Sequence, residues 1–255
     1  MSNVDSNTKQ QGYQFGQNHV IESLWLTFGK LDEGSWVLKP QEAILLHEKI
    51  KEFNPKQILE LGTGIGCSTA IMAFSCPQAR IYTVEQNQKC IDLAKKLIPT
   101  TLQERIYFRL SEPKVTRPIN QINPFMMWSI YGDYDWIDYD FIFVDGPGPF
   151  TVNVQGNQVL AEQPNGDILF LLHKMKPGTI IYVDKRKHAT ILYDRHLCST
   201  YNGEELIQKG YLEKLETSPK HTVYQRTDLP LREDFSDFVN MDHSLYELKK
   251  GGYFT

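Results

Sequence analysis

Residues 55–73 read PKQILELGTGIGCSTAIMA, an apolar strand pattern followed by a glycine-rich turn and an apolar helical segment. Gly62, Gly64 and Gly66 alternate as G-x-G-x-G, and Cys67 stands where a dinucleotide-binding fingerprint would have its third glycine. The missing third glycine weakens the dinucleotide interpretation. A phosphate-binding Walker loop is excluded more firmly than that, because its spacing and its Gly-Lys-Ser/Thr ending are both absent. The motif predicts a tight turn at a helix N-terminus, where polar atoms of a ligand can approach backbone N–H groups.

Length and composition predict one soluble globular domain. The chain has 255 residues, is 41% hydrophobic and 23% charged, and carries a net charge of −4, which makes a nucleic-acid partner unlikely on charge grounds. Residues 1–19 lack the regions of a secretory leader, and no run of about 18 apolar residues occurs, so we expect a cytoplasmic protein without a membrane partner. The cysteines lack metal-ligand spacing and are expected to be free thiols; they are Cys67, Cys76, Cys90 and Cys198.

Beyond the glycine turn, short apolar runs alternate with helical patterns. Strands are predicted at 57–62, 80–85, 105–110, 139–145 and 179–184, helices at 19–31, 40–53, 68–74, 88–98, 166–178 and 188–199, and two antiparallel strands at 211–218 and 221–227. Strands separated by helices form right-handed βαβ units. The sequence therefore predicts an α/β fold, a Rossmann-like three-layer sandwich with a mostly parallel seven-stranded sheet and an antiparallel C-terminal hairpin.

The sequence also predicts that the chain has three parts. Residues 1–17 are rich in Asn, Gln and Ser and are expected to be flexible. Residues 18–227 form the main domain, of which 18–54 supply two N-terminal helices. Residues 228–255 form a C-terminal extension with enough apolar residues to dock as a lid or a dimer arm.

In open α/β sheets, ligands bind beyond the carboxyl ends of the strands. Glu85 ends the second predicted strand, 23 residues after Gly62, at the place where a carboxylate can accept both hydroxyls of a ribose. The alternative is that Glu85 only caps the following helix and that the glycines only permit a sharp turn.

The succession ELGTGIGCST (60–69), VEQN (84–87), FVDG (143–146) and MKPGTIIYVD (175–184) resembles the class I S-adenosylmethionine-dependent methyltransferases. Within them it is most similar to the small-molecule O-methyltransferases that include catechol O-methyltransferase. The resemblance covers roughly residues 36 to 226. It implies S-adenosylmethionine as the cofactor and a small-molecule acceptor, with a hydroxyl as the expected methylated group.

The resemblance also implies which residues hold the cofactor. Glu60 and the loop residues Gly62, Thr63, Gly64 and Gly66 would surround the methionine part, with Ser68 hydrogen-bonding its carboxylate. Glu85 would hold the ribose and Gln86 would lie beside the adenine. Ser111 and Glu112 would border the adenine at the end of the third strand, although Ser111 could equally be a turn residue.

Asp145, at the end of an apolar strand, is the strongest candidate for a catalytic polar group, able to orient the cofactor's ammonium or the acceptor's hydroxyl; the alternative is a carboxylate that caps the following turn. In the metal-dependent members of the resembled branch, an acid after strand four and an Asp-Asp or Asp-Asn pair after strand five hold magnesium. Here Lys185 follows Asp184, and an ammonium cannot ligate a cation. DGPGP (145–149) also lacks the lysine that serves as base in that branch, so we expect no metal.

The stretch DKRKH (184–188) places three cations after a strand that ends on the ligand side. This stretch could bind an anionic acceptor, and the candidate substrate-binding residues are Asp184, Lys185 and Arg186. The alternative is a solvated loop. His188 is a candidate general base near neutral pH, or only a surface residue that opens a helix. Segment 120–139, with two tryptophans and three tyrosines, is either a wall of the acceptor pocket or a patch against a second subunit of a homodimer.

Two further functions remain open at this point. A nicotinamide-dependent oxidoreductase would use the same kind of glycine turn, although Cys67 replaces the third glycine. A non-catalytic cofactor-binding protein of the same fold would explain the missing third metal ligand and the missing lysine.

Overall fold

The computed structural model describes residues 19–31, 37–118, 128–132, 134–148, 150–154, 157–161, 164–198, 200–202, 205–207, 210–231 and 241–242. These ranges contain most of the main domain that the sequence predicts over 18–227. The expected flexible segment 1–17 lies outside the described residues, as does most of the C-terminal extension 228–255.

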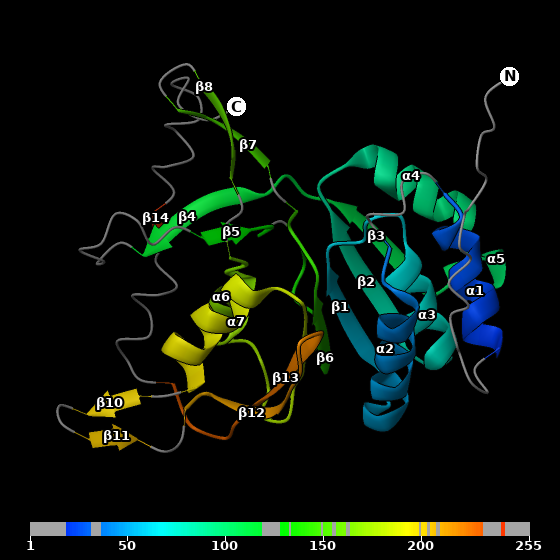
Figure 1. The fold of residues 1–255 in the computed structure, drawn as a ribbon. Helices are drawn as coiled ribbons and strands as arrows, with labels where there is room; N and C mark the ends of the chain where they lie inside the picture. The colour runs from blue at the N-terminus through cyan, green and yellow to red at the C-terminus, as the bar shows by residue number, and fades with distance from the viewer. Residues whose placement is uncertain are drawn as a thin grey trace, which may run out of the picture.

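A seven-stranded sheet forms the centre of the molecule (Figure 1). Its order is β12 (Leu212–Thr217), β13 (His221–Arg226), β9 (Ile180–Asp184), β6 (Phe141–Val144), β1 (Gln57–Leu61), β2 (Arg80–Glu85) and β3 (Ile106–Leu110). The five strands from β9 to β3 are parallel, whereas β13 pairs antiparallel with both β9 and β12. The predicted mostly parallel sheet with an antiparallel C-terminal hairpin is thereby confirmed.

Helices cover both faces of the sheet (Figure 1). One face carries α1 (His19–Gly29), α2 (Pro40–Phe53), α3 (Cys67–Ser75), α4 (Gln88–Leu97) and the short α5 (Thr100–Gln103); the other carries α6 (Asp167–Leu171) and α7 (Lys187–Tyr193). Successive strand residues point to opposite faces, so in β1 Ile58 packs in the core under α2 and α3, and Leu59 packs in the core under α6 and α7. The sheet lies between these two cores, with helices on either side, so the predicted three layers are present.

Two predicted helices differ in extent from the structure. The helix expected over 166–178 ends at Leu171, because the next amides bond back in tighter turns, with Lys174 N donating to the Leu171 carbonyl at 2.8 Å. The helix expected over 188–199 is α7, which continues as a π-helical turn, Asp194–Cys198.

Several strands outside the main sheet were not predicted. β4 (Lys114–Pro118) pairs with β5 (Trp128–Ile130) and with β14 (Met241–Asp242), β7 (Phe150–Val154) pairs with β8 (Asn157–Ala161), and β10 (Thr200–Asn202) pairs with β11 (Glu205–Ile207). The aromatic segment therefore contains strand β5, and two residues of the C-terminal extension pair with β4. The contact between β14 and β4 joins distant parts of the chain, which local sequence patterns do not report.

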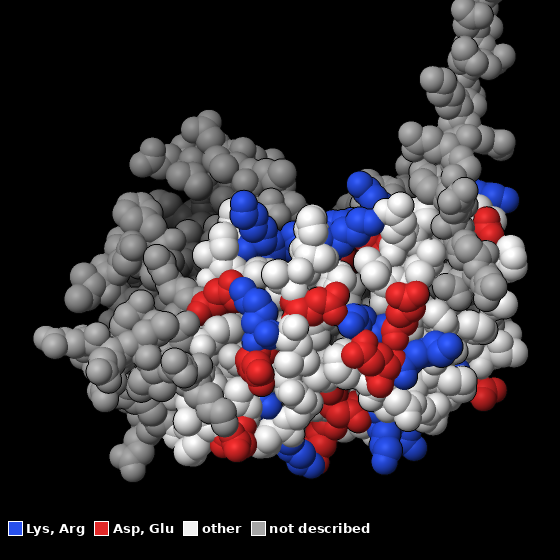
Figure 2. Space-filling model, turned by 60° about the horizontal axis from the view of Figure 1, so that its bottom comes forward, with Lys and Arg blue, Asp and Glu red and all other residues white. Residues whose placement is uncertain are grey.

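Charged side chains of both signs are interspersed over the face shown in Figure 2. Of the helices in the described part of the chain, none has the length and apolarity needed to cross a bilayer.

Candidate active site

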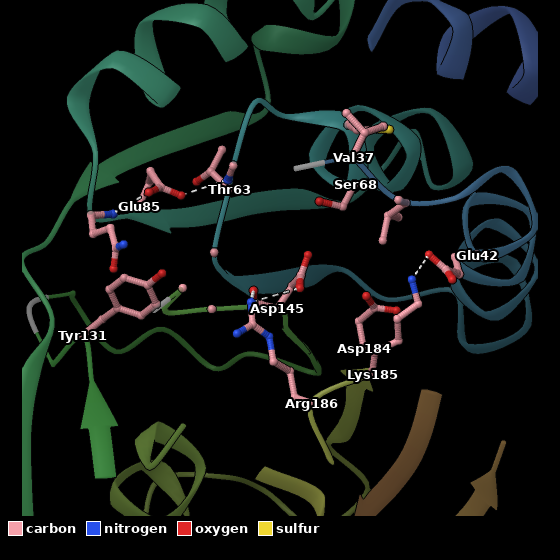
Figure 3. A pocket seen from close by; sticks show the side chains of 17 residues that line it. Val37, Glu42, Thr63, Ser68, Glu85, Tyr131, Asp145, Asp184, Lys185 and Arg186 are labelled. Atoms are coloured by element: carbon pink, nitrogen blue, oxygen red, sulfur yellow. Dashed lines mark hydrogen bonds and ion pairs between the residues drawn. The ribbon is translucent and has the colours of Figure 1, made fainter. Parts of the chain in front are cut away.

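A cavity of about 420 Å³ opens at the carboxyl ends of the parallel strands, within the usual size range of small-molecule sites. Its lining comes from the segments after β1, β2, β5, β6 and β9, from the residues before α2, and from the starts of α2 and α3 (Figure 3). The lining residues are Val37, Leu38, Glu42, Gly62, Thr63, Gly64, Cys67, Ser68, Glu85, Gln86, Tyr131, Asp145, Gly146, Gly148, Asp184, Lys185 and Arg186. Predicted site residues from four strand ends are thus brought together.

The glycine loop packs backbone to backbone against the loop after β6. Gly62 has φ +106°, and a Cβ on it would lie 2.7 Å from the Gly146 nitrogen, so a side chain is excluded both by conformation and by space. Gly66 is different. It does not line the cavity, and a Cβ there would lie 2.8 Å from Cβ of Ala94 on α4. Gly66 therefore lets α4 approach the loop, rather than facing a ligand.

Glu85 lines the cavity and also fixes the glycine loop. Its carboxylate accepts hydrogen bonds from the backbone amides of Gly64 at 2.8 Å, Gln86 at 2.9 Å and Asn87 at 3.0 Å. Burial raises the pKa of Glu85, and the three amides oppose that shift. The helix that follows is capped by the Asn87 side chain, which accepts from Lys89 N at 3.0 Å. The two interpretations of Glu85 are compatible, because one carboxylate can hold the turn and still face the cavity.

Glu60 lies beneath the cavity and holds Ser68, which lines it. Glu60 is fully buried, does not line the cavity, and accepts hydrogen bonds from the hydroxyls of Ser68 and Thr69, each at 2.5 Å. Burial raises the pKa of Glu60 to about 7. Ser68 does line the cavity, but its proton is donated to Glu60, so its oxygen faces a ligand as an acceptor.

The adenine side of the predicted site is built differently from expectation. Ser111 is buried beneath the cavity and donates its hydroxyl to the Tyr131 carbonyl at 3.0 Å, and Glu112 is exposed outside the lining. Tyr131 lines the cavity in their place. Gln86 also lines it, and among the described residues its buried Oε1 has no hydrogen-bond partner.

Two ion pairs dominate the other half of the cavity (Figure 3). Arg186 contacts Asp145, with Nη2 3.3 Å from Oδ1, and also donates to the backbone carbonyls of Asp145 and Pro147. Lys185 forms an ion pair with Glu42 on α2. Glu42 is only 2% exposed, and it also accepts from the Lys39 amide at 2.8 Å, in the capping box that begins α2.

Asp184, at the end of β9, differs from its neighbours because its carboxyl forms no ion pair with any residue that the structure describes. It is 5% exposed, it lines the cavity, and its Oδ1 has no hydrogen-bond partner among the described residues. Burial, reinforced by the nearby Asp145 carboxylate, raises the pKa of Asp184 to about 8.

His188 is not brought to this site. It lies exposed in the first turn of α7, outside the cavity lining. Conversely, sequence reasoning missed Glu42, Tyr131 and the segment before α2. Glu42 carries a local signal, the capping box, but that signal predicts a helix start and not a cavity. Within the described ranges, no cluster of three His, Cys, Asp or Glu side chains is arranged to hold a metal ion.

Known proteins are similar to parts of this chain. Residues 29–148 match the O-methyltransferase family model. A protein-L-isoaspartate O-methyltransferase from Dictyoglomus thermophilum is 25% identical over 150 residues, which is 58% of this chain and 62% of that protein. The corresponding enzyme of Dictyoglomus turgidum is 24% identical over 54% of this chain and 57% of its own length. The chain thus spans about three fifths of the length of these relatives.

Solved structures show the same fold at low sequence identity. A Klebsiella pneumoniae protein described as an O-methyltransferase is 15% identical, with a TM-score of 0.53 over 83% of this chain and 91% of that one. The Bacillus cereus O-methyltransferase, solved in complex with S-adenosylhomocysteine, is 14% identical, with a TM-score of 0.50 over 84% of this chain and 92% of its own. The chain has the class I methyltransferase fold, and its residues 29–148 carry the match to the O-methyltransferase family.

Proposed function

We propose that this protein is an S-adenosylmethionine-dependent methyltransferase that transfers a methyl group to a hydroxyl of a small molecule without a metal ion. One observation carries the proposal. Within the part of the chain that matches the O-methyltransferase family, the glycine loop and the Glu85 carboxylate line one cavity at the carboxyl ends of the strands, which is where α/β sheets of this type bind ligands. The Bacillus cereus structure, with the same fold, holds S-adenosylhomocysteine.

The unpaired polar atoms of the cavity fit this cofactor. Glu85 accepts hydrogen bonds from three backbone amides and so keeps one of its roughly four lone pairs, on Oε2, to accept a ribose hydroxyl. The Oε1 of Gln86, which has no partner among the described residues, can accept from the amino group of adenine. Asp145 lines the cavity beside the glycine loop, where a carboxylate can receive the ammonium of the methionine part. When bound, S-adenosylmethionine supplies an electrophilic methyl group. The chain's own contribution is to hold the acceptor in line with that group and to exclude water.

The ion pairs support a reaction without a metal. Lys185 occupies the position after Asp184 and forms an ion pair with Glu42, and Arg186 forms one with Asp145. Each pair partly offsets the charge of a carboxylate, which leaves Glu42 and Asp145 poorer ligands for a divalent ion. Of the two predicted catalytic residues, Asp145 lines the cavity, whereas His188 does not. We therefore propose Asp145, and not His188, as the orienting residue.

Calorimetric titration with S-adenosylhomocysteine tests the proposal. We expect micromolar binding to the wild-type protein, and Glu85→Gln should weaken it by about 1–3 kcal/mol, because the neutral amide accepts ribose hydroxyls less strongly. NAD serves as the competing ligand. Preference for NAD would favour the oxidoreductase and contradict the proposal. Tight S-adenosylhomocysteine binding without methyl transfer to any member of a broad panel of phenols and alcohols would favour a non-catalytic protein of this fold.

A reducing, cytoplasmic location is part of the proposal and is supported by the thiols. All four cysteines are free, and Cys67 and Cys76 are buried. The homodimer stays a prediction, and light scattering coupled to size-exclusion chromatography would check it.

A further inference from the structure

Of the three cations that follow β9, the two that line the cavity already form ion pairs. Lys185 forms an ion pair with the buried Glu42, and Arg186 donates to the side chain and backbone of Asp145 and to the Pro147 carbonyl. An anionic acceptor would have to compete with the carboxylate that each of these cations already contacts. Displacing the Glu42 carboxylate would leave it buried without an ion-pair partner, which is costly. The two cations that line the cavity therefore act within the protein.

Asp184 lies at the same end of the cavity. The residue is only 5% exposed, and it lines the cavity beside Lys185 (Figure 3). Among the described residues its Oδ1 has no hydrogen-bond partner. An unpaired buried acceptor costs free energy until a donor meets it. The described lining of the cavity offers no such donor to Oδ1, so a donor from a ligand is the simplest complement.

The position of Asp184 separates it from the ribose end. The order of strands is β9, β6, β1, β2, so Asp184 and Glu85 end strands that lie three places apart. With neighbouring strands about 4.8 Å apart, the two carboxyl groups are separated by roughly 14 Å across the strand ends. Asp145 and the glycine loop lie between them. A cofactor that has its ribose at Glu85 and its methionine part at the glycine loop presents its reactive end toward Asp184.

We propose that Asp184 accepts a hydrogen bond from the group that receives the methyl, and that this group is a neutral hydroxyl and not an anion. This inference rests on the function proposed above and narrows its substrate class. In the free protein, burial, Asp145 and Glu42 raise the pKa of Asp184, and Lys185 and Arg186 oppose the shift. The carboxyl is therefore not held as an anion by the two cations beside it. A hydrogen-bond donor or an ammonium that binds the carboxylate should lower this pKa.

Two cofactor analogues test the proposal without a known acceptor. S-adenosylhomocysteine carries nothing at the methyl position, whereas sinefungin carries an amine there, which as an ammonium points toward the acceptor. We expect the wild-type protein to bind sinefungin more tightly than S-adenosylhomocysteine. In Asp184→Asn, sinefungin affinity should fall by about 10-fold or more, with S-adenosylhomocysteine affinity within about 2-fold of wild type.

The matched control is Glu85→Gln, which should weaken both ligands by the same factor, since both carry the same ribose. Retained S-adenosylhomocysteine binding by Asp184→Asn also shows that this variant is folded. An unchanged ratio of the two affinities in Asp184→Asn would overturn the assignment of Asp184 and leave the proposed function intact. Failure of the wild-type protein to bind either analogue would instead overturn the proposed function and this inference with it.

Discussion

The two halves of the cavity are built by different means. On the side of β1 and β2, Glu85 is held by three backbone amides from its own turn and from the glycine loop. On the side of β6 and β9, the charged side chains are held by ion pairs, one of which joins β9 to α2 across most of the chain. The first half depends on backbone geometry, and the second depends on side-chain charge. Substitutions should therefore damage the halves in different ways.

The largest effect is expected where the backbone leaves no room. Gly62→Ala places a Cβ 2.7 Å from the Gly146 nitrogen at φ +106°, combining conformational strain with overpacking. We expect a loss of about 3–5 kcal/mol in the free energy of unfolding, measured by urea denaturation. Two controls separate the causes. Gly178→Ala has φ +90° but open space, and Gly148→Ala would meet only Gln86 Nε2 at 3.7 Å. A Gly62→Ala loss no larger than that of Gly178→Ala would contradict the packing argument.

A smaller loss is expected when the ion pair to α2 is broken. Lys185→Met leaves Glu42 buried at 2% exposure without its cation, whereas Lys185 itself is 39% exposed. We expect a loss of about 2–4 kcal/mol in the free energy of unfolding, checked by chemical denaturation. The control is Lys176→Met, because the Lys176 pair with Asp138 is exposed on both sides, at 67% and 61%; it should cost under about 1 kcal/mol. Equal losses in the two variants would show that the burial of Glu42 does not increase the contribution of its ion pair to the free energy of unfolding.

The third prediction concerns pH. The folded-state pKa of Asp184, about 8, lies above its ordinary value of 3.8, so protonated Asp184 stabilises the fold at low pH and this contribution is lost as pH rises through 8. Relative to wild type, the Asp184→Asn variant should gain about 1–3 kcal/mol in the free energy of unfolding between pH 5 and pH 8.

Comparing the pH dependence of the free energy of unfolding in wild type and in Asp184→Asn separates the effect of Asp184 from the effects of other buried carboxyls. Burial also raises the pKa of Glu60 to about 7 and that of Asp167 to about 6, and both titrate in wild type and variant alike. Parallel pH profiles of the two proteins would show that Asp184 keeps an ordinary pKa.

The smallest effect is expected outside the cavity. His188→Ala should change stability and S-adenosylhomocysteine affinity by less than about 0.5 kcal/mol, because His188 is exposed on α7 and does not line the cavity. Thermal denaturation and calorimetry measure both quantities. With any acceptor found by screening, a rate loss of about 100-fold at unchanged affinity would restore His188 as the general base.

The same contrast explains what the sequence could predict. The strand pattern, the glycine turn and Glu85 are local features, and the structure bears out the sheet and brings the glycine loop and Glu85 together. The partner of Lys185 was not predictable, because Glu42 is distant in sequence and its position indicates only the start of a helix. The pairing of Arg186 with Asp145 likewise joins residues that are far apart in the sequence. Ser111 and Gly66 were predicted at the cavity but support it from behind, Ser111 through Tyr131 and Gly66 through α4. A local motif identifies the turn and does not show which side chains face the cavity.

A crystal structure of the protein with S-adenosylhomocysteine would show where the cofactor binds and in which direction it lies. We expect ribose hydroxyls within hydrogen-bond distance of Glu85, the adenine beside Gln86 and Tyr131, and the sulfur atom between the glycine loop and Asp145, with Asp184 beyond it. A ligand bound in the reverse direction, with its adenine at Asp184, or bound outside this cavity, would contradict this expectation.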